Sequence, residues 1–277
     1  MPFRPGEHAM SRELEPLYED VPRHLSHQLT QWTAGYLNSR DANGIERIRA
    51  IANHMRYDYA QAPKVASNST KDADMRMYIL KKCQQPEEHL RVVEYLLPSV
   101  HISSALALEE MLRLANSAYA VSSEAKRLEM RVEPEVKAQV EAVIAAATES
   151  AGGHLTNAWN EAYGREADPV KSYSESIKAV EAALAQSVSP QNDKQTLGTM
   201  IRDVAAKPAK WEFVIAGGSV GGVETMLSMM RMLWEGQTSR HGGVNLTRDE
   251  TPEEAKAAVH FAATLVQFGV SGAFSIA

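Results

Sequence analysis

Apolar residues recur along most of the chain at the three- and four-residue spacing of an amphipathic helix. In the first half this spacing predicts five helices, over residues 22–37, 45–59, 72–83, 86–97 and 103–116. In the second half it predicts helices over residues 134–163, 169–184, 196–204 and 223–235, and a last one that ends near residue 268. The sequence therefore predicts an all-α fold, a bundle of many helices.

Between the two halves the period changes from helical spacing to strict alternation. Residues 119–121 and 127–132 form two such short runs, in which Leu128 and Met130 would face one side and Glu129 and Arg131 the other. This pattern predicts a short β-hairpin. It also predicts a boundary that separates an N-terminal helical region, residues 1–132, from a C-terminal domain, residues 133–277.

Local signals indicate where several helices begin and end. The Asn43–Gly44 dipeptide is expected to break the chain before the second helix, and Gly152–Gly153 is expected to kink or stop the helix that Pro134 opens. Asp168 before Pro169 is a typical helix start, since the Asp side chain can accept an amide hydrogen bond and proline suits the first helical position. Thr251 followed by two glutamates predicts a capped start for the last helix.

Composition and charge narrow the class of protein. A chain of 277 residues with 44% hydrophobic and 23% charged residues is globular rather than disordered. The formal charge of −6 argues against a broad basic surface, so any nucleic-acid contact must be local. The single Cys83 cannot form an intrachain disulfide, which suits a reducing cytosol.

The two ends of the chain bear on localisation. Residues 1–11 contain no apolar stretch of the kind found in a secretory signal. Residues 257–277 contain no charged side chain and are long enough for a tail anchor, but they are rich in Ala and Ser and interrupted by Gly269 and Gly272. A buried closing helix explains them better. We therefore expect a cytoplasmic protein with no membrane partner.

Three other patterns have ordinary structural explanations. Residues 217–222 are rich in glycine and precede a helix, but they lack the Lys–Ser/Thr of a phosphate-binding loop and are expected to be a connector. His24 and His27 lack a clear third metal ligand. Four methionines on one helix are expected to fill gaps in the core: Met226, Met229, Met230 and Met232. No cofactor and no metal site is predicted.

The most informative cluster for chemistry lies between the last two long helices. Arg240 and His241 are adjacent there, and Arg231 and Glu235 precede them by one to two helical turns. A histidine beside an arginine supplies a proton carrier next to a fixed cation, which is what metal-free RNA cleavage needs. The same residues also suit a solvated loop in which cations cap a helix end.

Read together, the C-terminal stretches resemble a known family. Residues 173–184, 195–198, 240–242 and 255–268 occur in an order that resembles the C-terminal domain of abortive-infection proteins, and the region looks like a divergent member of the HEPN superfamily. The resemblance covers residues 134–268, about half of the chain. It implies an all-α bundle that pairs as a homodimer, and a metal-independent endoribonuclease that acts as a toxin in phage defence, with RNA as substrate and a phage protein as a possible trigger.

The chain departs from the family at one position. The resemblance places the family's motif His on His241, but the Arg expected a few residues earlier falls near Trp234, and the polar residue that follows it falls on Glu235. Either Arg240 or Arg231 supplies the missing cation, or the domain binds without cutting. The first case predicts His241 as general acid/base, Arg240 as phosphate clamp, and Arg231 or Glu235 in support. The second predicts a non-catalytic sensor or scaffold for a phage component or partner protein. A plain structural dimer without a ligand is a third possibility.

Overall fold

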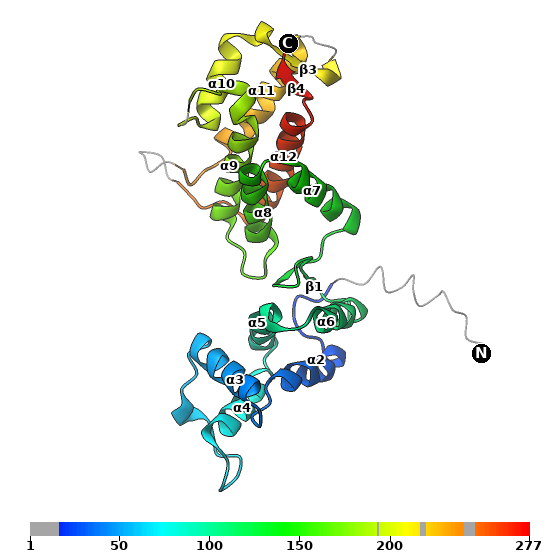
Figure 1. Cartoon of the computed structure of the whole chain (residues 1–277), viewed down its shortest axis with the longest axis vertical. Helices are drawn as coiled ribbons and strands as arrows, with labels where there is room; N and C mark the ends of the chain where they lie inside the picture. Colours follow the sequence, from blue (N-terminus) through cyan, green and yellow to red (C-terminus); the bar gives the residue numbers. More distant parts are fainter. Residues whose placement is uncertain (1–16, 193, 217–219, 241–246) are drawn as a thin grey trace, which may run out of the picture. The chain divides into compact units, whose positions relative to one another are not determined.

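The structure is a computed structural model that describes residues 17–192, 194–216, 220–240 and 247–277. Its contacts divide the chain into two compact units, Met1–Arg131 and Val132–Ala277. The described parts of both units consist mainly of helices, and this confirms the predicted all-α class (Figure 1).

The first unit contains five α-helices among its described residues, namely α2 (Arg23–Tyr36), α3 (Ala42–His54), α4 (Lys71–Lys82), α5 (Pro86–Leu96) and α6 (Ile102–Leu114). Two buried clusters hold them together. One joins α2, α5 and α6 around residues such as Leu29, Leu90 and Leu108, and the other joins α3, α4 and α5 around Ile48 and Met75. Helix α5 contributes to both clusters, because its apolar stripe is wide enough to face two neighbours.

Helix starts in this unit follow from capping side chains. The Asp41 carboxylate accepts the Gly44 N–H at 2.7 Å, so α3 begins at Ala42. The expected break at Asn43–Gly44 is therefore wrong, since both residues lie in the first turn of that helix. Thr70 caps α4 by accepting the Ala73 N–H at 3.2 Å.

Strands β1 (Tyr119–Val121) and β2 (Leu128–Met130) form the predicted antiparallel hairpin, with Val121 opposite Leu128. Leu128 is fully buried, as the alternation predicts. Glu129, on the other side of the strand, is buried as well, with only 5% of the residue exposed.

The second unit contains α7 (Pro134–Ala146), α8 (Glu149–Tyr163), α9 (Pro169–Val188), α10 (Leu197–Ala206), α11 (Val220–Glu235) and α12 (Pro252–Val270). Its centre is formed by α8, α9 and α12, which pack against one another. Small buried residues such as Ala158, Ser172 and Ala262 let these three helices approach closely. The predicted caps are confirmed at Asp168, which accepts the Lys171 N–H, and at Thr251, which forms a capping box with Glu254.

The predicted long helix over residues 134–163 is two helices, and the break lies before the Gly pair rather than at it. Helix α7 ends at Ala146, and Thr148 then caps α8 by accepting the Ala151 N–H at 3.3 Å. Gly152 lies inside α8, where a Cβ atom would come within 2.8 Å of the Ile144 carbonyl oxygen. The glycine is thus used for close contact between two helices rather than for a kink.

A second strand pair corrects the prediction of at most one hairpin. Strand β3 (Trp211–Phe213) pairs antiparallel with β4 (Phe274–Ile276), which follows the last helix. The Trp211 and Phe274 rings stack at 5.4 Å. Figure 1 shows this pair with α10 and α11 at one end of the unit. Helix α12 continues to Val270, slightly beyond the expected end near residue 268.

The methionine prediction is confirmed in part. Met226 and Met230 on α11 are fully buried, whereas Met232 is 68% exposed. The glycine-rich connector lies partly outside the described residues, which resume at Val220 as the first residue of α11, so that Gly221 and Gly222 are helical.

Candidate functional site

The cluster predicted from the sequence lies where α11 leads into the loop before α12. Arg231 and Glu235 belong to the end of α11, and Arg240 lies in the loop that follows. His241 falls outside the described residues. The geometry of the site is therefore built from Arg240 and the residues that surround it.

Arg240 is held against the side chain of Trp234. Its guanidinium carbon lies 3.5 Å from the centre of the indole ring, and its Nη1 donates a hydrogen bond of 2.7 Å to the Trp234 carbonyl oxygen. Burial lowers the pKa of Arg240, and the nearby Glu181, Tyr173 and Glu235 partly oppose this shift. A guanidinium that stacks on an aromatic face is attracted by the ring and has few other orientations open to it, so the cation is fixed in place.

Trp234 is in turn fixed by the first turn of α10. A Cβ atom on Gly198 would come within 2.8 Å of the Trp234 ring carbon Cε2, so the indole lies directly on the glycine backbone. Thr196 and Thr199 form a capping box that starts α10 at this point. The Leu197 N–H donates to Glu181 on α9 at 2.6 Å, which ties the start of α10 to the central helices.

The two ends of the loop that carries Arg240 are joined. The Ser239 N–H donates to the Glu250 carboxylate at 2.9 Å, and the Thr238 hydroxyl donates to the Arg248 carbonyl oxygen at 2.9 Å. Glu250 is 4% exposed, and its second oxygen, Oε2, accepts no hydrogen bond from the described residues. The loop base is thus a short, hydrogen-bonded neck.

Tyr173 on α9 lies close to the base of this loop, next to Gly236. Its hydroxyl group fills the space that a side chain at Gly236 would need. Burial, followed by the negative charges of Glu250 and Glu254, raises the pKa of Tyr173 to about 12. Tyr173 therefore keeps its proton at neutral pH and offers a hydroxyl donor close to Arg240.

The structure brings together only some of the predicted residues. Glu235 is exposed but lies close enough to Arg240 to act on its pKa. Arg231 is exposed on α11 and forms no hydrogen bond or ion pair with any residue that the structure describes. Of the two arginines proposed to supply the cation, Arg240 is the one that contacts Trp234.

A second polar cluster beside the site was not predicted from the sequence. His154 on α8 lies with its Nδ1 atom 2.7 Å from the Glu175 carboxylate on α9, and the Lys178 ammonium donates to the same carboxylate at 2.7 Å. Burial would raise the pKa of Glu175, but the hydrogen bonds from His154 and Lys178 outweigh it and the pKa is lowered. The three-residue spacing of Glu175 and Lys178 was visible in the sequence, whereas the contact with His154 depends on how α8 packs on α9.

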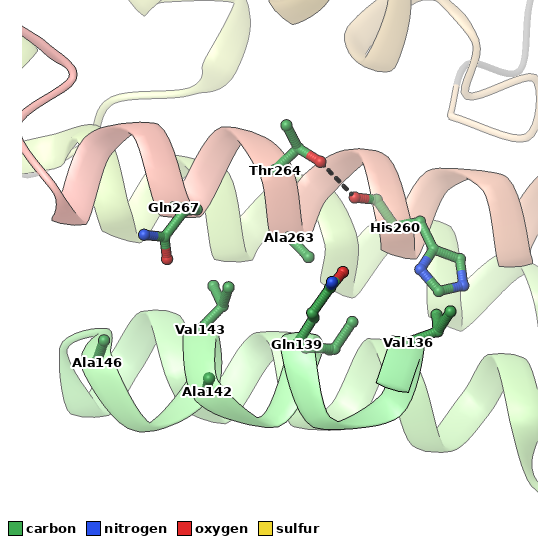
Figure 2. A pocket seen from close by; sticks show the side chains of 10 residues that line it. Val136, Gln139, Ala142, Val143, Ala146, His260, Ala263, Thr264 and Gln267 are labelled. Atoms are coloured by element: carbon green, nitrogen blue, oxygen red, sulfur yellow. Dashed lines mark hydrogen bonds between the residues drawn. The ribbon is translucent and has the colours of Figure 1, made fainter. Parts of the chain in front are cut away.

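The unit also has a groove of about 570 Å³ between α7 and α12. Figure 2 shows Val136, Gln139 and Val143 of α7 pointing toward α12, with the His260 ring at one end. The His260 Nε2 atom is hydrogen-bonded to the Tyr163 hydroxyl at 2.7 Å, and burial lowers the pKa of His260. The lining of the groove is mostly apolar, and one nitrogen of its imidazole is already engaged.

Other classes of site receive no support from the described residues. Within the described ranges no three His, Cys, Asp or Glu side chains are grouped so as to hold a metal ion. His24 contacts the Ala115 carbonyl oxygen and His27 contacts Gln31, so the two do not form a pair. None of the described helices is both long and apolar enough to span a bilayer. Cys83 is buried, and burial, followed by the charge of Glu88, raises the pKa of its thiol to about 12.

Comparisons of the chain with protein-family models, with curated proteins and with solved structures found no match.

Proposed function

We propose that the C-terminal unit is a HEPN-like domain and that the protein cleaves RNA without a metal ion as a toxin in phage defence. The observation that carries the proposal is the contact between Arg240 and Trp234. The resemblance places the expected motif arginine near Trp234, and the guanidinium of Arg240, which follows later in the chain, lies on the face of that indole. This contact supports Arg240 as the residue that takes the place of the missing cation.

The chemistry needs a proton carrier and a cation, and no other reagent. The ribose 2′-hydroxyl attacks the adjacent phosphorus, the bond from phosphorus to the 5′ oxygen breaks, and a 2′,3′-cyclic phosphate and a 5′-hydroxyl result. His241 acts as general acid/base, which removes the 2′-hydroxyl proton or protonates the departing 5′ oxygen. Arg240 stabilises the negative charge that builds up on the phosphorane oxygens. A fixed electrostatic donor of this kind is typically worth about 2.7–4 kcal/mol of the barrier.

The wider setting of this activity is part of the same proposal. The domain would act as a cytoplasmic homodimer that places two copies of the site near a two-fold axis, and a phage protein would trigger it. The acidic net charge of −6 agrees with a contact to RNA that is confined to the site itself.

The test compares the wild-type chain with His241→Ala and Arg240→Ala, expressed in bacteria and as purified proteins. We expect growth arrest and cleavage of total RNA by the wild type, with cleavage reduced about 100- to 1,000-fold by Arg240→Ala. Arg202→Ala, an exposed arginine on α10, is the matched control and should behave as wild type. Equal toxicity of wild type and His241→Ala, or no cleavage by either, contradicts the proposal.

A non-catalytic sensor or scaffold is the second candidate, and one observation favours it. Three carboxylates, those of Glu181, Glu235 and Glu250, lie around Arg240 or the base of its loop. Negative charge at these positions weakens the attraction of Arg240 for phosphate. RNA cleavage by the wild type that Arg240→Ala abolishes would exclude this second function.

A further inference from the structure

His154 and Glu175 have the arrangement of a carboxylate-oriented general base. Glu175 is 7% exposed and accepts hydrogen bonds from His154, from Lys178 and, at 3.4 Å, from Asn157. His154 itself keeps about a third of its side chain accessible. A buried carboxylate thus holds one edge of an imidazole that is still within reach of a ligand.

The carboxylate decides which imidazole nitrogen carries the proton. An ionised carboxylate can only accept hydrogen bonds, and its three donors keep Glu175 ionised at neutral pH. The His154 Nδ1 atom must therefore be the donor. In a neutral imidazole this leaves the Nε2 lone pair as the acceptor, which is the atom that a general base uses.

The pair belongs to the same neighbourhood as Arg240. Glu181 follows Glu175 by less than two turns on α9 and accepts a hydrogen bond from the Leu197 N–H at the start of α10. The indole of Trp234, which belongs to α11, packs against the next residue, Gly198. The Glu181 carboxylate is close enough to both His154 and Arg240 for each to act on its charge. Glu181 thus links the His154–Glu175 pair electrostatically to Arg240.

We propose that His154, oriented by Glu175, is a second proton-transfer group of the RNA-cleaving site, working opposite the phosphate bound by Arg240. The inference rests on the proposed function, which it deepens. It adds Lys178 as a second cation on the same side of α9, exposed over about half of its side chain.

The assignment gives a balanced step. Cleavage of RNA by its own 2′-hydroxyl involves two proton transfers, namely removal of the hydroxyl proton and protonation of the departing 5′ oxygen, which two groups can share. His154 removes the first proton at Nε2 while Glu175 stabilises the imidazolium that forms, as a carboxylate does for a base whose other nitrogen it holds. The second proton reaches the 5′ oxygen from the other acid of the site or from water, so no oxidant, reductant or metal is consumed.

The test uses the full-length purified protein, a single-stranded RNA homopolymer as probe, and added imidazole. His154→Ala should lower the cleavage rate about 100-fold or more, and free imidazole should restore part of the lost rate because it can occupy the vacated space and carry the proton. His27→Ala, an exposed histidine of the first unit, is the matched control and should neither lose activity nor respond to imidazole. His154→Gln keeps the size of the side chain and covers the case in which the alanine variant fails to fold.

Each outcome decides the inference. Rescue of His154→Ala by imidazole supports it. Wild-type rates in a folded His154 variant overturn it while leaving the ribonuclease proposal intact. A loss of activity in a folded His154→Ala protein that imidazole does not reverse also overturns it, since that result indicates a structural role. Absence of cleavage by the wild type overturns both. Glu175→Gln supplies a second readout: it should reduce the rate without making the enzyme respond to imidazole, because the His154 ring is still present.

Discussion

Gly198 lies directly against the indole of Trp234, with no room between them for a methyl group. The glycine is the second residue of α10, and Trp234 is close to the end of α11, so one contact fixes the distance between two helices. Because Arg240 stacks on the same indole, the position of the cation depends on this contact between Gly198 and Trp234.

Gly198→Ala should displace Trp234 and release Arg240. We expect a loss of about 1–3 kcal/mol in the free energy of unfolding, as for other overpacked sites, together with reduced RNA cleavage. Urea unfolding and cleavage assays measure the two effects. Gly153→Ala is the control, because a Cβ atom there meets nothing within 4 Å and alanine favours a helix. A Gly198→Ala protein with wild-type stability and activity would contradict this account.

Arg240→Lys separates charge from geometry. Lysine retains the positive charge but lacks the planar group that stacks on Trp234 while donating to its carbonyl oxygen. We expect a cleavage rate between those of the wild type and Arg240→Ala. Rates measured over a range of salt concentrations check this, since a loosely held cation is screened more strongly. A lysine variant equal to the wild type would show that the stacked geometry is not needed.

Gly152→Ala and Gly153→Ala should have opposite effects on stability although the two glycines are adjacent in α8. The first places a methyl group within 2.8 Å of the Ile144 carbonyl oxygen and should destabilise the protein by about 1–3 kcal/mol. The second replaces an exposed helical glycine and should stabilise it by about 0.5–1 kcal/mol. Thermal unfolding of the pair provides the measurement, and equal shifts of the same sign would mean that α7 does not pack on α8 as described.

His89 should make the stability of the protein depend on pH in a defined window. The side chain is fully buried, contacts the Thr33 hydroxyl at 3.0 Å, and has a pKa that burial lowers from 6.5 to about 4. Between these values the unfolded chain binds the proton and the folded chain does not. The contribution of neutral His89 to the free energy of unfolding is therefore fully present above pH 6.5. It is lost as the pH drops toward 4, by on the order of 3 kcal/mol.

Urea unfolding of the wild type and His89→Gln at several pH values between 7.5 and 4.5 tests this dependence. The variant should lose most of the slope, and what remains should include the contribution of His260, whose pKa is also lowered by burial. An unchanged slope in His89→Gln would assign the effect to other groups.

Local sequence signals predicted the parts of the fold that depend on neighbouring residues. The caps at Asp168 and Thr251 use side chains three residues from their partners, so spacing alone reveals them. Strands β3 and β4 escaped prediction because each has only three residues and its partner is remote in the sequence. Gly152 was misjudged because its reason lies in contact with Ile144 of a different helix.

The same distinction applies to the candidate site. The sequence drew attention to Arg240 because an arginine stands beside a histidine there, but its contact with Trp234 depends on how the chain turns after α11. The pairing of His154 with Glu175 joins two helices whose relative rotation no local pattern specifies. Residues that act together across helices therefore had to be found from the structure.

The pairing of β3 with β4 has a consequence for how the second unit folds. The contacts of α8 with α9 join segments that are adjacent in sequence and can form early, whereas α11 and α12 lie between the two strands in the sequence. Closing so long a loop is entropically costly until the helices between its ends have ordered. Stacking of Trp211 on Phe274 is thus expected to be among the last events of folding, and the fluorescence of that tryptophan would report its completion.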